Sequence, residues 1–254
     1  MSTPPSPPAP FVDLTSQARS VARLAEGVRE DQLDAPTPCP DYAVRHLLGH
    51  LVSLSVAFRD AARRELGPTT DTSPGSSLPE LPADWRVALP GALAEMAEAW
   101  RDPAAWEGET RAGGVPLPGA VAGLVAVDEL VVHGWDLARA TGQEYAPDEA
   151  ALRASEALLT PVEDPAADPT EQSVTEDPAA KDPAAKDPAA KDPAAKDPAA
   201  KDSAAKDSED SAGDPAGDAS SGAGLFGPPV PVPDGAPLLD RVIGLSGRDP
   251  GWRA

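Results

Sequence analysis

The sequence contains three histidines, and two of them stand where helical spacing can bring them to one metal site. His50 shares an apolar stripe with Leu47 and Leu51, so it is expected to point into a helical bundle. Glu129 and His133 are four residues apart, which places both on one face of a helix. Two imidazoles and one carboxylate form a ligand set that leaves a divalent ion open to an exogenous ligand.

The same residues also have an ordinary structural interpretation. A glutamate four residues before a histidine occurs by chance, and an isolated inward histidine is usually a core residue with a satisfied hydrogen bond. Asp136 lies one turn beyond His133 and has two interpretations. In the first it orients a ligand or acts as a base, and in the second it is an ordinary aspartate on the helix surface. Cys39 lies just before a helix, where thiol pKa values fall, but its flanking prolines favour a structural connection.

Helices with apolar periodicity are needed to position these side chains, and the predicted fold class is therefore all-α. The sequence predicts helical stretches over residues 13–28, 42–66, 83–100, 119–141, 147–159 and 238–245. We expect Asp41 to cap the second stretch, and Pro90 to start the third one late or to kink it. Segments 67–82 and 102–118 are rich in turn-forming residues and are predicted to be loops.

A low-complexity insert interrupts the folded sequence. Every lysine lies between Lys181 and Lys206, and five copies of DPAAK run from residue 177 to 201, followed by a sixth with serine in place of proline. Such a segment buries too little apolar surface to offset the entropy of ordering it. We therefore predict a disordered arm (1–10), a folded body (11–160), a disordered acidic insert (161–223) that is dispensable for folding, and a tail (224–254) that docks back on the body.

Composition excludes several classes of partner. The formal net charge of -21 repels nucleic-acid phosphates and anionic membranes, so neither is an expected partner. One cysteine cannot form an intramolecular disulfide, which fits a reducing compartment. The start of the chain lacks the basic and apolar regions of a signal peptide, and the most apolar run, 121–132, is too short to cross a bilayer. The expected localisation is cytoplasmic.

Three motifs resemble those of a known bacterial family. They are TPCPDYAVRHLLGHLV at residues 37–52, DELVVHGWDLARATG at 128–142, and LFGPPVPVP at 225–233 followed by an Arg-Asp-Pro at 248–250. In this order they resemble the DinB-like superfamily, and within it the metal-binding domain of mycothiol-dependent maleylpyruvate isomerase. The resemblance covers about residues 12–159 and 224–252 and leaves out the insert.

The resemblance implies a four-helix bundle and a specific ligand set. The histidine of the family's first motif corresponds to His50, and the two ligands one turn apart on its late helix correspond to Glu129 and His133. Relatives often carry aspartate where this chain has His46, so His46 is left out of the ligand set. Zinc is the metal that mycothiol-dependent members usually hold, while other members of the superfamily take nickel or other divalent ions.

The function implied is a thiol-dependent transferase or isomerase with mycothiol as cosubstrate, acting on a small molecule, with Asp136 as the candidate catalytic residue. The isomerase itself has a substantial second domain that supplies an arginine to its active site. Only a short tail follows the insert here, with Arg241 and Arg248 as candidate replacements, which makes maleylpyruvate a doubtful substrate. The alternative is a non-catalytic metal-binding bundle with a stress or regulatory role. The sequence does not predict the oligomeric state.

Overall fold

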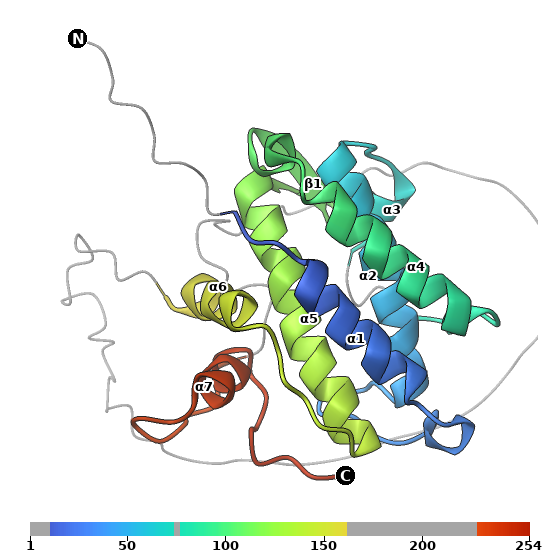
Figure 1. Ribbon diagram of the computed structural model, residues 1–254, viewed down its shortest axis with the longest axis vertical. Coiled ribbons are helices and arrows are strands. Elements are labelled where there is room, and N and C mark those ends of the chain that lie inside the picture. The colour runs from blue at the N-terminus through green and yellow to red at the C-terminus, as the bar shows by residue number, and fades with distance from the viewer. Residues whose placement is uncertain (1–10, 74–76, 162–227) are drawn as a thin grey trace, which may run out of the picture. The chain divides into compact units, whose positions relative to one another are not determined.

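The computed structural model describes residues 11–73, 77–161 and 228–254. All of them fall in one of the two compact units into which the chain divides. The predicted arm (1–10) and nearly all of the predicted insert lie outside the described residues. Within the described ranges the structure is mostly helical (Figure 1).

The helices agree closely with the sequence periodicity. The α-helices are α1 (Thr15–Glu26), α2 (Val44–Arg63), α3 (Pro68–Asp71), α4 (Trp85–Ala99), α5 (Gly119–Thr141), α6 (Glu149–Leu159) and α7 (Leu238–Leu245). Two short 3-10 helices, η1 (Glu30–Gln32) and η2 (Pro103–Trp106), lie in the connections. The predicted helical bundle with a docked C-terminal segment is confirmed, although the smallest elements were not expected.

Four helices form the bundle that holds the core. Helix α1 packs against α4 and α5, and α2 packs against the same two partners, so the four close into a ring (Figure 1). The apolar stripes meet inside: Leu47, Leu51 and Leu130 are fully buried. Each such leucine stabilises the fold by roughly 2 kcal/mol, which offsets the cost of holding polar groups among them.

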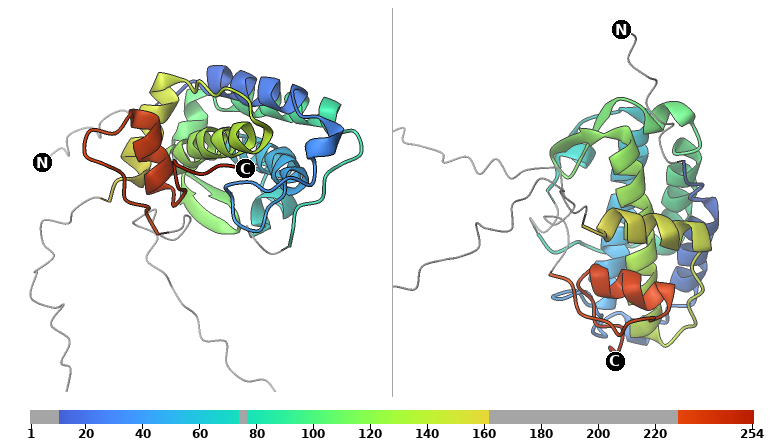
Figure 2. Two further views of the ribbon diagram at one scale, coloured as in Figure 1. Left: turned by 90° about the horizontal axis from the view of Figure 1, so that it is seen from below. Right: turned by 90° about the vertical axis from the view of Figure 1, so that its left-hand side faces the viewer.

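Helix α5 is the central element of this bundle. It is buried along most of its length, and α6 packs across it on the side that the bundle leaves open (Figure 2). It ends where the sequence predicts, because Gly142 adopts the left-handed conformation (φ 67°) that closes a helix without a steric penalty. A rigid, buried α5 is a suitable frame for side chains that must keep fixed positions.

A β-hairpin occupies a segment predicted to be a loop. Strands β1 (Glu109–Ala112) and β2 (Val115–Pro118) pair antiparallel around Gly113 and Gly114, whose φ values of 60° and 81° fit a two-residue hairpin turn. The Thr110 hydroxyl donates to the Ala61 carbonyl of α2 at 2.6 Å, which ties the hairpin to the bundle. The Gly-Gly pair was the available sequence signal for this turn.

One prediction about a helix start is wrong, and one of two alternatives for another is excluded. Asp41 does not cap α2: it has a φ of 65°, and the helix begins at Val44. The cap comes instead from His46, whose Nδ1 accepts a hydrogen bond from the Ala43 N–H at 3.2 Å. Of the two alternatives for the third stretch, the late start is excluded, because α4 begins at Trp85 and carries Pro90 inside it.

The C-terminal segment docks on the body through α7. Helix α7 packs against α6, and the Arg241 guanidinium pairs with Glu156 of α6 at 2.7 Å. Residues 228–233 run beside α7, with the Val230 N–H donating to the Gly244 carbonyl at 2.8 Å. A Cβ at position 244 would lie 2.7 Å from the Val230 oxygen, so this approach requires glycine. No helix within the described ranges is long and apolar enough to cross a membrane.

Candidate metal centre

Helices α2 and α5 bring three potential ligands together. His50 projects from α2, while Glu129 and His133 project from adjacent turns of α5. The Glu129 Oε2 lies 3.3 Å from the His50 Nε2 and 3.1 Å from the His133 Nε2. The two imidazole rings meet nearly at right angles, with centroids 4.8 Å apart. The structure thus unites the three residues that the sequence singled out.

The spacing of these donor atoms fits a tetrahedral divalent ion. One donor atom from each residue lies within 4.8 Å of the others. Zinc bonds of about 2.0–2.1 Å at tetrahedral angles place neighbouring ligand atoms roughly 3.4 Å apart. The two short distances above match that edge closely. Nitrogen and carboxylate oxygen are also donors that zinc accepts, so the residues present fit the ion that the resemblance implies.

The group is open to solvent on one side. The His50 and Glu129 side chains are 19% and 21% exposed, whereas the His133 side chain is 9% exposed. The ring of Tyr42, which is only partly buried, stands edge-on to His50 with a centroid distance of 5.8 Å. Solvent therefore reaches the group at His50 and Glu129, and Tyr42 lies beside His50. Sequence analysis did not identify Tyr42, because its role depends on how the 37–43 connection folds.

Charge interactions inside the group shift two pKa values. Burial alone would raise the pKa of Glu129, but hydrogen bonds with His133 and His50 hold it below its usual range. Burial alone would lower the pKa of His133, but hydrogen bonds with Asp136 and Glu129 raise it to about 9. Without a metal, a protonated His133 therefore lies between two carboxylates at neutral pH.

Asp136 lies behind His133 in the interior. Its side chain has no exposed surface, and its Oδ2 lies 2.9 Å from the His133 Nδ1. The surface interpretation of Asp136 is therefore wrong. A carboxylate on Nδ1 fixes the ring orientation and directs Nε2 toward Glu129 and His50, as second partners of metal-binding histidines commonly do. This position favours orienting His133 over proton transfer at an exogenous ligand.

The two candidate arginines of the tail lie in different places. Arg248 reaches the site, where its Nη2 is 3.4 Å from the Asp136 Oδ2 and its side chain is 12% exposed. Arg241 pairs with Glu156 at the interface of α6 and α7 instead. Long-range placement of this kind has no signature in sequence spacing.

Cys39 borders the same region. Its sulfur, with donor atoms of His133 and Asp136, forms a second set within 4.8 Å. Burial raises the pKa of the Cys39 thiol to about 11, although Arg248 opposes the shift. A thiol this weakly acidic stays protonated at neutral pH, and Arg248 already compensates Asp136. The first set is therefore the better metal centre, and the structural interpretation of Cys39 is favoured over the reactive one.

Asp128 is a further buried carboxyl that sequence analysis did not single out. Burial raises its pKa to about 7, the charge of Glu129 adds to the effect, and the Ser155 hydroxyl opposes it. Because a carboxyl of this pKa is partly neutral near pH 7, α5 can hold it beside α6 at a lower cost than a charged group. It shares no ligand set with the two histidines.

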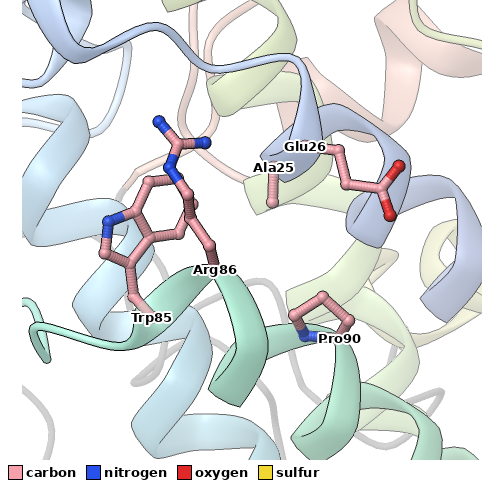
Figure 3. A pocket seen from close by; sticks show the side chains of 5 residues that line it. All are labelled: Ala25, Glu26, Trp85, Arg86 and Pro90. Atoms are coloured by element: carbon pink, nitrogen blue, oxygen red, sulfur yellow. The ribbon is translucent and has the colours of Figure 1, made fainter.

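A shallow hollow between α1 and α4 is unconnected with this chemistry. It is lined by Ala25, Glu26, Trp85, Arg86 and Pro90 (Figure 3). Its volume of about 170 Å³ is below the ~300–1,000 Å³ of ordinary small-molecule pockets. None of its lining residues belongs to the ligand set, so we do not assign it a role.

Comparison with known proteins places the bundle among its relatives. A family model described as the mycothiol maleylpyruvate isomerase N-terminal domain matches residues 14–138. Two uncharacterized proteins from two strains of Mycobacterium tuberculosis are each 29% identical over 144 residues, which cover 55% of this chain and 74% of theirs.

Two solved structures are also similar to this chain. They are crystal structures of the mycothiol-dependent maleylpyruvate isomerase and of a histidine-to-alanine mutant of it, with TM-scores of 0.43 and 0.44 and identities of 18% and 20%. Each match covers 57% of this chain and 65% of the other, so the chain spans just under two thirds of those structures.

Proposed function

Residues 14–138 belong to the mycothiol maleylpyruvate isomerase N-terminal domain family, and on this basis we propose that the protein binds one divalent metal ion through His50, Glu129 and His133, with zinc as the first candidate. The observation that supports the proposal best is the convergence of three donor atoms from two helices at metal-ligand spacing. The lower pKa of Glu129 adds to it, because a carboxylate that stays ionised is ready to bind a cation.

The second part of the proposal is that a small thiol is the exogenous ligand. A divalent ion with three protein ligands keeps a free position and lowers the pKa of a thiol bound there, which supplies a nucleophile near neutral pH. The family that matches residues 14–138 is named for mycothiol maleylpyruvate isomerase, so mycothiol is the thiol to test first. The protein would then transfer or isomerise adducts of that thiol.

The protein's own residues have distinct tasks in this scheme. His50 and His133 would supply neutral imidazole nitrogens to the metal, and Glu129 would supply the one negative charge among the ligands. The Asp136 carboxylate contacts the Nδ1 of His133 and keeps the imidazole ring from rotating. Tyr42 lines the open side, where the thiol and its adduct would lie.

A non-catalytic metal-binding bundle is the second candidate. The 19% and 21% exposed fractions of His50 and Glu129 favour the first candidate, because a purely structural site is normally closed to solvent. Metal analysis of the purified full chain tests the metal, and a thiol titration beside it tests the chemistry. A protein that holds metal but binds no thiol would be the non-catalytic bundle.

Metal affinity is expected to rise with pH. A protonated His133 has no free Nε2 lone pair, and its pKa of about 9 means that a metal must displace a proton at neutral pH. The apparent association constant should therefore increase roughly tenfold per pH unit between about pH 7 and pH 8.5, and flatten above about pH 9. Chelator competition at a series of pH values measures this slope. An affinity that does not change over that range would show that metal binding does not displace a proton from His133.

A further inference from the structure

We propose that Arg248 is a positioning residue of the metal centre, which acts through Asp136 on the ligand His133. This inference rests on the proposed metal site but extends it to the C-terminal segment. The chain of contacts is continuous: Arg248 Nη2 lies 3.4 Å from Asp136 Oδ2, and the same oxygen lies 2.9 Å from His133 Nδ1. The tail would thereby contribute to metal binding without supplying a ligand.

The backbone of the tail holds Arg248 firmly in this place. Helix α7 ends in a Schellman motif: the Gly247 N–H donates to the Gly244 carbonyl, and the Arg248 N–H donates to the Ile243 carbonyl, both at 3.0 Å. Gly247 has the left-handed φ of 82° that this motif requires. The Arg248 Nη1 also donates to the Ser246 carbonyl at 3.1 Å. The backbone from which the Arg248 side chain extends toward Asp136 is therefore fixed by the C-cap of α7.

The buried carboxylate of Asp136 is the reason why the site needs this arginine. Asp136 is completely buried, and a buried carboxylate is costly without a cationic partner. Among the described residues, Arg248 supplies the guanidinium in contact with Asp136, 3.4 Å from its Oδ2. Its positive charge does not oppose the metal strongly, because Asp136 lies directly against it.

The geometry also commits Arg248 to a protein partner. Its guanidinium lies against Asp136, and its side chain is only 12% exposed. Both terminal nitrogens contact protein oxygens: Nη1 lies 3.1 Å from the Ser246 carbonyl and Nη2 lies 3.4 Å from the Asp136 carboxylate. The role inferred for Arg248 is therefore support of His133, and an incoming ligand is expected on the opposite side, beside His50.

A double-mutant cycle on the full chain tests the inference. Zinc affinity is measured by chelator competition for the wild type, Arg248→Gln, Asp136→Asn and the double variant. Arg248→Gln should weaken zinc binding about tenfold or more, the scale known for partners of metal ligands. In the Asp136→Asn background the same change should cost less than about threefold, because the neutral amide needs no cation. A purely structural role of Arg248 would give equal losses in both backgrounds.

Controls separate this inference from the proposed metal site. Arg241→Gln breaks the other ion pair of α7, at 2.7 Å to Glu156, and should leave zinc affinity unchanged. If Arg248→Gln does not fold by circular dichroism, Arg248→Lys keeps the charge and should retain most of the affinity, while loss equal to that of Asp136→Asn would contradict the charge argument. Wild-type protein without zinc binding refutes the proposed function. Zinc binding that Arg248→Gln leaves unchanged refutes only the role of Arg248.

Discussion

Replacing His133 by alanine is expected to weaken metal binding by more than about 100-fold, since changes to partners of a ligand already cost 10–100-fold. The substitution removes the Nε2 donor 3.1 Å from Glu129 and leaves two protein ligands, His50 and Glu129. It also leaves Asp136 without its hydrogen-bond partner on Nδ1. Elemental analysis after dialysis, together with chelator competition, should show one metal equivalent in the wild type and almost none in the variant.

His46 provides the matched control for that experiment. It is the remaining histidine of the chain, lies one turn from His50 on α2, and uses its Nδ1 to cap the helix at Ala43. His46→Ala should therefore cost some helix stability but retain one metal equivalent. Circular dichroism of both variants checks that they fold. If His133→Ala kept a full equivalent, or if His46→Ala lost it, the ligand assignment would be wrong.

Mycothiol is expected to bind the metal-loaded protein and to show no measurable binding to the metal-stripped protein. The open side of the centre lies beside His50 and Tyr42, so a thiol can reach the free position of an ion held there. In a cobalt-loaded protein, thiol binding should produce a thiolate-to-cobalt charge-transfer band, and calorimetry should give a heat of binding. Both signals should be absent after chelation of the metal.

Two comparisons make the thiol experiment specific. Mycothiol alkylated on sulfur keeps the rest of the molecule and should give no charge-transfer band. The His46→Ala protein should bind mycothiol as the wild type does, because His46 takes no part in the ligand set. Absence of thiol binding at millimolar concentration, with metal demonstrably present, would contradict the enzyme interpretation and leave the non-catalytic bundle.

The long elements of the fold were predictable because their sequence patterns are local. Residues 119–141 were predicted as one helix and form α5 with the same bounds, since an apolar face recurs along the whole segment and Gly142 ends it. Residues 238–245 likewise form α7 as predicted. The hairpin around Gly113 was missed, because its strands are only four residues long and carry no clear alternation.

The centre itself was predictable only in part. His50, Glu129 and His133 were found because helical spacing and the motif resemblance both point to them. The burial of Asp136 and its contact with Arg248 could not be derived in this way, because 112 residues separate the two in sequence. Asp41 was misjudged for a related reason: its side chain suits a helix cap, but the turn before α2 puts its backbone in the left-handed region and His46 takes that role.

A cobalt titration of the metal-free full chain tests the metal centre most directly. We expect saturable binding of one equivalent, with absorption bands of a four-coordinate ion bound by nitrogen and oxygen, and displacement by one equivalent of zinc. Those bands should be absent in Glu129→Ala, which removes the carboxylate shared by His50 and His133. Binding that does not saturate at one equivalent, or that persists unchanged in Glu129→Ala, would contradict a single centre built from these three residues.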